Sequence, residues 1–152
     1  MKFSTGMVEA QANAGGMKST LDSGIIYIYS GSQPTDADNA ATGTLLALIT
    51  LNGDAFTHGS PANGLVFENP GGGVCRKPAA AVWRGVGIAA GQAAWFRFSG
   101  NALDNQGSST TLPRIDGTIG TSGADLIVST RSVAVGVPLS VDVFAVTFPK
   151  SA

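Results

Sequence analysis

The sequence predicts a mainly β protein: an antiparallel β-sandwich of seven to nine short strands, preceded by one N-terminal amphipathic helix. Short segments rich in β-branched and aromatic residues alternate with turns that contain Gly, Pro, Asn and Asp, as expected of a sandwich. A run of apolar residues at helical spacing comes before the first of these segments. Because no linker divides its 152 residues, the chain is expected to form a single domain, with the helix in residues 1–23 and the sandwich in residues 24–152.

The apolar run at the N-terminus has steps of four, three, four, three and four residues and consists of Phe3, Met7, Ala10, Ala14, Met17 and Leu21. This spacing places the side chains on one face of a helix. Ser4 or Thr5 can cap the helix, while Gly15 and Gly16 weaken its second half by about 1 kcal/mol each relative to Ala. We expect one helix with a possible break at the glycine pair, whose apolar face packs on the core or on another subunit.

The predicted centre of the sheet is the stretch of residues 25–51. Its two strands, 25–29 and 44–51, are apolar on both faces, which is typical of strands that are covered on both sides. Residues 30–39 between them are rich in Gly, Ser, Pro, Asp and Asn, each of which favours turns. We expect the strands to lie inside the domain and the loop to be exposed, where its shape and backbone hydrogen bonds can serve contact with a neighbour.

Turn residues separate further strands, which are predicted at residues 65–67, 79–88, 93–99, 114–121, 124–129 and 138–148. Residues 89–92 are the expected reversal that pairs the second and third of these as a hairpin, and residues 122–123 form a later turn. Asn69, Pro70 and the three glycines after them predict a long loop, because proline lacks an amide donor and glycine is costly to order. Asp142 is expected at an edge or a wet rim, because an unpaired buried carboxylate is costly.

The charge pattern favours association with other proteins. Only 12% of the residues are charged, against about 25% in an ordinary soluble domain. The formal net charge of −1 leaves little self-repulsion, so we expect a homo-oligomer or a surface that partners cover. The basic residues are dispersed, whereas a nucleic-acid partner requires a clustered basic surface. We therefore expect no nucleic-acid partner. No window reaches about 18 apolar residues and no secretory signal is evident, so we expect no membrane partner and we expect the protein to be made in a cytoplasm.

Residues that could carry hydrolytic chemistry are few. His58 is the single histidine, and Asp54 and Ser60 are its neighbours in sequence, but a triad needs convergence in space and an oxyanion hole. We expect His58 to be a solvent-facing loop residue and Cys75 to be a small buried side chain. The sequence therefore predicts no catalytic residue, and we expect the protein not to be an enzyme.

Metal and ligand motifs are equally sparse. Zinc needs several Cys or His ligands, and the chain has one of each. Asp36 and Asp38 begin like an oxygen-ligand loop, but alanines stand at its fifth and sixth positions. Residues 71–73 lack the Gly-Lys-Ser/Thr ending of a phosphate-binding loop. Trp83 and Trp95 could stack on sugars, although aromatic residues at strand spacing more often lie in the core. We expect no metal and no cofactor.

Two segments, residues 28–51 and 116–148, carry a resemblance to a known group of proteins. The matching motifs are Tyr29-Ser30-Gly31, the loop from Pro34 to Ala40, Gly43-Thr44-Leu45-Leu46, Ala94-Trp95-Phe96-Arg97 and the run from Gly117 to Leu126. With them the chain resembles, over nearly its whole length, small structural proteins of tailed bacteriophages. Residues 62–84 depart most from that pattern.

The resemblance implies a non-enzymatic virion protein that is made in the cytoplasm of a bacterial host. A capsid decoration or cement protein is the leading hypothesis, with the major capsid protein or another virion protein as its partner. A tail or baseplate component and a carbohydrate-binding adsorption module that uses Trp83 or Trp95 are the alternatives. The candidate partner contacts are Phe3, Met7, Met17, Gln33, Pro34, Asp36, Asp38, Arg76 and Lys77.

Overall fold

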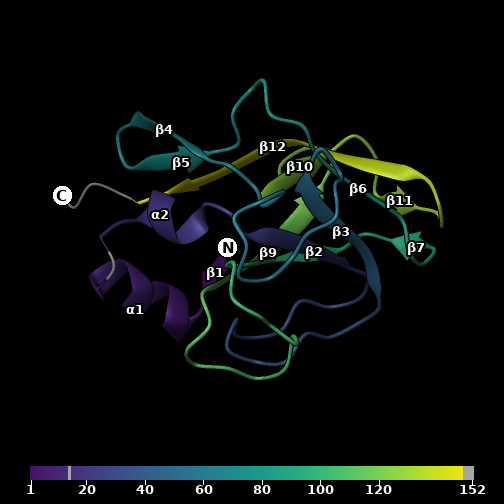
Figure 1. The fold of residues 1–152 in the computed structure, drawn as a ribbon. Helices are drawn as coiled ribbons and strands as arrows, with labels where there is room; N and C mark the ends of the chain where they lie inside the picture. Colours follow the sequence, from purple (N-terminus) through teal and green to yellow (C-terminus); the bar gives the residue numbers. More distant parts are fainter. Residues whose placement is uncertain (14, 149–152) are drawn as a thin grey trace.

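The centre of the molecule is a closed barrel of seven strands (Figure 1), seen in a computed structural model that describes residues 1–13 and 15–148. Around the barrel the order is β9 (Arg114–Gly120), β8 (Trp95–Ser99), β2 (Ile25–Tyr29), β3 (Leu45–Leu51), β6 (Trp83–Val86), β12 (Pro138–Thr147) and β10 (Leu126–Val128), which returns to β9. Neighbours are antiparallel except β9 and β10, which are parallel. The predicted antiparallel sandwich is therefore wrong: one mixed sheet closes on itself.

The parallel pair closes the barrel. Strand β10 runs beside the last two residues of β9, with Leu126 opposite Ile119. Parallel neighbours usually need a connection of a dozen or more residues. Here residues 121–125 suffice, because the two strands overlap so briefly. The Asp125 carboxylate fixes this loop by accepting hydrogen bonds from the amide of Thr118 at 3.0 Å and from its hydroxyl at 3.2 Å.

The predicted hairpin of residues 79–88 and 93–99 is also wrong. These segments contain β6 and β8, which lie on different sides of β2 and β3 in the barrel. Residues 89–92 connect them and hold β7 (Gly91–Gln92), which pairs with β11 (Ser132–Val133) in a small separate sheet. Both segments do contain a strand, but the composition of a strand does not identify its neighbour.

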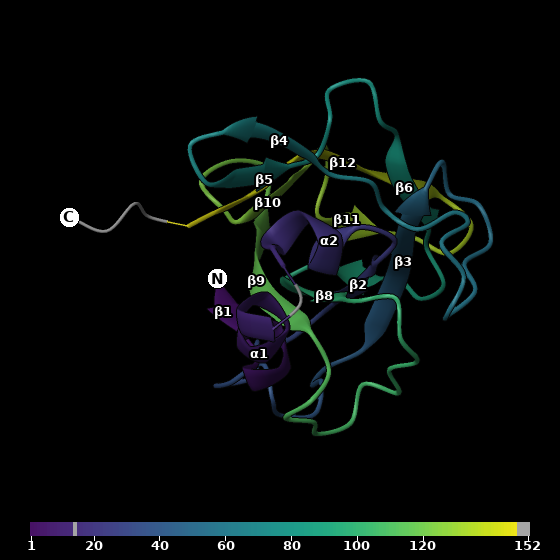
Figure 2. The same cartoon turned by 60° about the vertical axis from the view of Figure 1, so that its left-hand side comes forward.

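A β-hairpin extends the sheet beyond β12, where the sequence predicted a loop. It consists of β4 (Glu68–Gly71) and β5 (Val74–Arg76), and it stands out from the barrel (Figure 2). Gly71, Gly72 and Gly73 all have positive φ, so they turn the chain in a conformation that other residues rarely adopt. The predicted strand at 65–67 is reduced to a single bridge between Leu65 and Gly24.

Two short helices replace the single predicted helix: α1 (Thr5–Asn13) and α2 (Met17–Leu21). They are separated at Gly15 and Gly16, whose φ values are 84° and 135°, so the chain breaks at the glycine pair. Ser4 caps α1 as expected, because its Oγ accepts a hydrogen bond from the amide of Met7 at 3.0 Å. Strand β1 (Lys2–Phe3) precedes the cap and pairs with β9.

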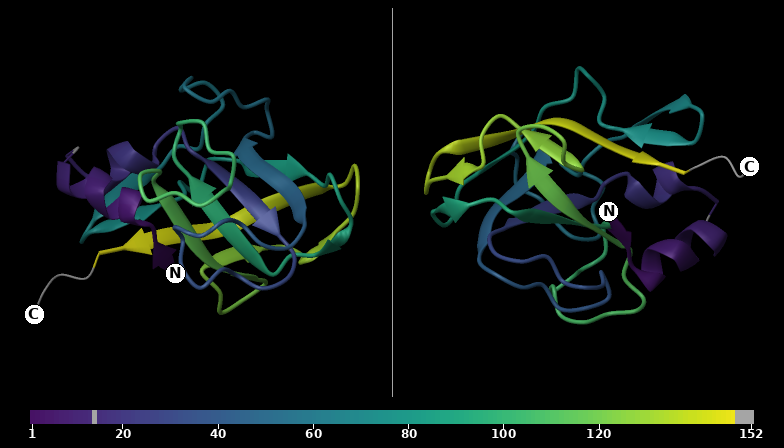
Figure 3. Two further views of the ribbon diagram at one scale, coloured as in Figure 1. Left: turned by 90° about the horizontal axis from the view of Figure 1, so that it is seen from below. Right: turned by 180° about the vertical axis from the view of Figure 1, so that it is seen from behind.

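The predicted apolar helical face does pack on the core. Met7, Met17 and Leu21 belong to the same hydrophobic cluster as the residues that fill the barrel. Phe3 lies in β1 and packs against the edge of the same cluster, while Ala14 falls outside the described residues. The helices thus cover one side of the barrel, as the views from below and from behind show (Figure 3).

Strand β2 is buried on both faces, as predicted for the centre of the sheet. Ile26 and Ile28 point into the barrel, whereas Ile25, Tyr27 and Tyr29 belong to a second cluster outside it. Trp95 on β8 joins that outer cluster and stacks on Tyr29, with ring centroids 4.5 Å apart. The loops of residues 30–43 and 101–113 cover this outer face (Figure 1, bottom).

We predict that Asp125→Ala destabilises the fold by about 1–3 kcal/mol, because the amide of Thr118 loses its acceptor where the barrel closes. Urea unfolding followed by circular dichroism measures the change. Asp142→Ala removes a carboxylate from the exposed side of β12 and serves as the matched control, with a change within about 0.5 kcal/mol. Equal unfolding midpoints for the two variants would contradict this role of Asp125.

Candidate functional site

The residues of the possible hydrolytic triad do not come together. Ser60 Oγ accepts a hydrogen bond from the amide of Ala62 at 3.2 Å. His58 is half-buried, not solvent-facing as predicted, and packs edge-on against Phe56 with ring centroids 5.0 Å apart. In the described part of the chain, no hydrogen bond joins His58 to Asp54 or Ser60. The arrangement offers no activated nucleophile.

Cys75 is buried, as expected, and its pKa is raised by burial and, to a smaller extent, by the nearby charge of Asp22. A thiol of raised pKa is a weak nucleophile at neutral pH. Among residues 1–13 and 15–148, no group of three or more His, Cys, Asp or Glu residues could hold a metal ion. The helices of the same residues are too short to cross a membrane.

The aromatic residues considered as sugar platforms lie in the interior. Trp83 and Trp95 expose 0% and 1% of their surfaces. Phe96 and Phe98, the other aromatic residues of β8, are fully buried in the main core cluster. The reading of these side chains as core residues is confirmed, and neither indole face is open to a ring of a carbohydrate.

The loop of residues 30–43 uses most of its candidate contact residues to bind the rest of this chain. The Asp38 carboxylate accepts hydrogen bonds from the amide and hydroxyl of Thr5, at 2.8 and 2.6 Å, and so fastens the start of α1. Pro34 is buried, and its carbonyl accepts a hydrogen bond from Lys2 Nζ at 2.5 Å. Gln33 is half-buried, which leaves Asp36 as the exposed candidate in this loop.

Two buried ion pairs lie outside the barrel, one between two strands and one between a strand and a covering loop, and the sequence analysis missed both. Arg97 on β8 makes two hydrogen bonds of 2.7 Å to Asp116 on β9. Arg114 on β9 binds Asp104 in the loop of residues 101–113 through bonds of 2.7 and 2.6 Å. All four side chains are at most 1% exposed. The sequence holds one signal for these pairs: Arg97, Arg114 and Asp116 are charged residues within otherwise apolar strands.

The buried layer connects further groups around these pairs. Asp104 also accepts hydrogen bonds from Ser99 Oγ and from the amide of Gln106. Burial opposes ionisation of Asp104, but the hydrogen bonds from Arg114, Gln106 and Ser99 outweigh it and lower the pKa of the carboxyl. Burial raises the pKa of Tyr27 to about 12. The layer therefore acts as a structural clamp, and its charged groups are not offered to a ligand.

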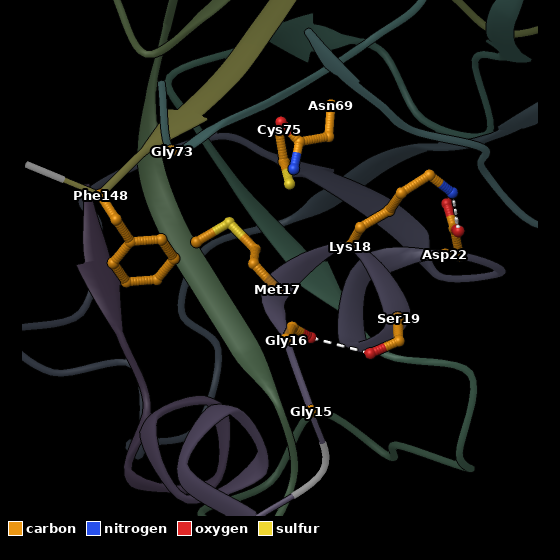
Figure 4. Close-up of a pocket in the computed structure, with 10 residues that line it drawn as sticks. All are labelled: Gly15, Gly16, Met17, Lys18, Ser19, Asp22, Asn69, Gly73, Cys75 and Phe148. Atoms are coloured by element: carbon orange, nitrogen blue, oxygen red, sulfur yellow. Dashed lines mark hydrogen bonds and ion pairs between the residues drawn. The ribbon is translucent and has the colours of Figure 1, made fainter. Parts of the chain in front are cut away.

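The hairpin β4–β5 and helix α2 enclose a pocket of about 510 Å³ (Figure 4). Met17 and Phe148 line one side, while Cys75 and Asn69 line the other. An ion pair between Lys18 and Asp22 lies at its rim. The candidate partner contacts not yet placed are Phe3, Met7, Arg76 and Lys77.

Near the pocket, Phe3 stacks on Phe148 with ring centroids 5.9 Å apart. Arg76 is exposed on β5 and pairs with Glu68 on β4 at 2.6 Å, and Lys77 follows it, half-buried. Met7 is 0% exposed, so its side chain is not available at the surface. We call the surface formed by β4, β5 and α2 the hairpin face.

A second surface lies on the other side of the molecule in Figure 1, where β6 meets the start of β12. Val86, Ile88, Val135 and Val137 are 49%, 54%, 66% and 52% exposed. They are neighbours, because Gly87 bridges to Val135 and donates its amide to the carbonyl of Val137 at 3.0 Å. We call these four residues the apolar corner. The sequence analysis missed it, because Val86 and Val135 are 49 residues apart in the chain.

We predict that Asp104→Asn destabilises the protein by about 3–5 kcal/mol, because it leaves Arg114 buried without a counter-charge. The folded pKa of Asp104 lies below its ordinary value of 3.8, so its contribution is complete above that value and is lost as the pH falls through the folded pKa. Chemical unfolding between pH 7 and pH 2 should therefore show a smaller acid loss in the variant. Asp36→Asn, an exposed carboxylate, is the control. A difference between wild type and Asp104→Asn that stays constant down to pH 2 would argue against the linkage.

The chain matches no protein-family model, no curated protein and no solved structure.

Proposed function

We propose that this chain is a non-enzymatic structural protein of a tailed bacteriophage virion, and that it decorates the capsid by binding the assembled shell. The motifs of residues 28–51 and 116–148 support the class of protein. The observation that supports a docking role is the hairpin face: a β-hairpin that projects from a closed barrel beside a short helix. The partner is the major capsid protein or another virion protein.

The hairpin face suits a contact with another protein for three physical reasons. The hairpin lies within residues 62–84, the part that departs most from the pattern of the resembling proteins, so it can carry a specific contact. Its glycine turn and exposed Asn69 and Pro70 can approach another surface closely. Arg76, which pairs with Glu68, and the half-buried Lys77 place two basic side chains at its base.

A decoration protein needs no strong single contact. A shell presents the same docking site many times, so modest contacts add up when each bound subunit spans neighbouring shell proteins. The low charge content and the near-zero net charge of the chain reduce repulsion between copies at high local density. A role in adsorption through a tryptophan platform is not proposed, because Trp83 and Trp95 are buried.

We predict that purified protein binds emptied capsids and that the double variant Arg76→Ala, Lys77→Ala binds roughly tenfold more weakly, because an exposed arginine and a half-buried lysine are removed from the contact. Co-sedimentation with capsids measures the binding. Arg131→Ala, next to β11 on the other side of the barrel, is the matched control and should bind like wild type.

Mass spectrometry of purified particles tests the wider proposal, since a virion protein must be present in them. Its absence would rule out any structural role in the particle. Co-fractionation with tails, without binding to capsids, would replace decoration by a tail or baseplate role. Electron-microscopic reconstruction would then give the position, copy number and symmetry together.

A further inference from the structure

The apolar corner borders a groove that could receive a side chain. The groove has a volume of about 290 Å³ and lies between the outer face of the barrel and residues 53–58. Leu48 and Phe56 line its apolar wall, and Val86 and Ile88 form the edge that it shares with the corner. An exposed apolar protrusion, Val135 to Val137, therefore stands next to an apolar hollow on the same surface.

Two opposite charges lie together beside this surface. Asp54 and Arg84 are both exposed, and both line a smaller hollow of about 240 Å³ beside Val86 and Pro138. Arg84 Nε donates a hydrogen bond to the carbonyl of Asn52 at 2.8 Å. Within residues 1–13 and 15–148, neither Asp54 nor Arg84 belongs to an ion pair. The corner thus has an uncharged centre, with one acid and one base at its rim.

We infer that the apolar corner binds a second copy of this chain through a two-fold symmetric contact. A two-fold axis brings the same patch of both copies together, so each patch must be complementary to itself. Here the protrusion of one copy meets the groove of the other, and the Asp54 of each copy faces the Arg84 of its neighbour. A second copy offers charge complementarity, because a two-fold axis lets the acid of each patch face the base of the other.

Self-association is also consistent with the composition of the chain. A net charge of −1 opposes the approach of two copies only weakly. A standard interface takes about 800 Å² from each partner, roughly a ninth of the 7066 Å² accessible surface of this chain. The contact does not depend on the proposed virion role, because the hairpin face lies elsewhere on the molecule.

The test is a charge exchange measured by sedimentation velocity of the full chain. Wild type should form a dimer. Asp54→Arg and Arg84→Asp should each raise the dimer dissociation constant roughly tenfold, because each places two like-charge pairs at the rim. An equimolar mixture of the two variants should dimerise again, since every Arg then faces an Asp. Pairing of the two residues within one copy cannot produce this rescue.

Matched variants define the controls. Glu9→Arg reverses an exposed acid on α1, far from the corner, and should leave dimerisation unchanged. Val137→Asp should weaken the dimer without altering the circular dichroism spectrum, because the side chain is 52% exposed. A wild type that stays monomeric at all concentrations, or a mixture that stays monomeric, would overturn the inference. Capsid binding by a monomeric wild type would support the proposed function and contradict the dimer. A dimer that binds no capsid would support the dimer and contradict capsid decoration.

Discussion

The two buried arginine–carboxylate pairs outside the barrel hold two neighbouring strands and a covering loop together. Arg97 and Asp116 join β8 to β9, and Arg114 joins β9 to Asp104 in a covering loop. Two further residues lie in register with the first pair: Tyr27 on β2 is opposite Arg97, and Lys2 on β1 is opposite Asp116. Because the covering loops are anchored here, the outer cluster around β2 can stay dry.

Such an arrangement contributes specificity more clearly than it contributes stability. Removing four charged groups from water costs about as much as their pairing returns, so an apolar layer of the same shape could be equally stable. An apolar layer would, however, accept several positions of the loops. Two-pronged hydrogen bonds between planar groups accept one, and the pair of Arg114 and Asp104 fixes the loop of residues 101–113 in this way. Single bonds from Arg114 to the carbonyl of Ala37 and from the amide of Thr5 to Asp38 hold the loop of residues 30–43 and the start of α1.

The sequence predicted the positions of most strands and the buried centre at residues 25–51, because β-branched and aromatic runs depend on local composition. It did not predict which strands are neighbours. The segments around Trp83 and Trp95 follow each other in the chain, yet β3 and β2 separate them in the barrel. It also missed the parallel pairing at Ile119 and the partner of Arg97, because both depend on which strands pair and in which register, which no local pattern encodes.

Closure of the barrel explains why the surfaces proposed for contact lie where they do. A closed sheet has no free edges, so the chain can present unpaired backbone only in segments added to the barrel. The hairpin β4–β5 is such a segment on one side, and the pair β7–β11 next to the apolar corner is another on the opposite side. A rigid barrel between two contact surfaces fixes their relative orientation. A subunit with one surface for a larger assembly and one for a sister copy can therefore join neighbouring sites at a defined spacing, which a flexible connection between the same two surfaces could not do.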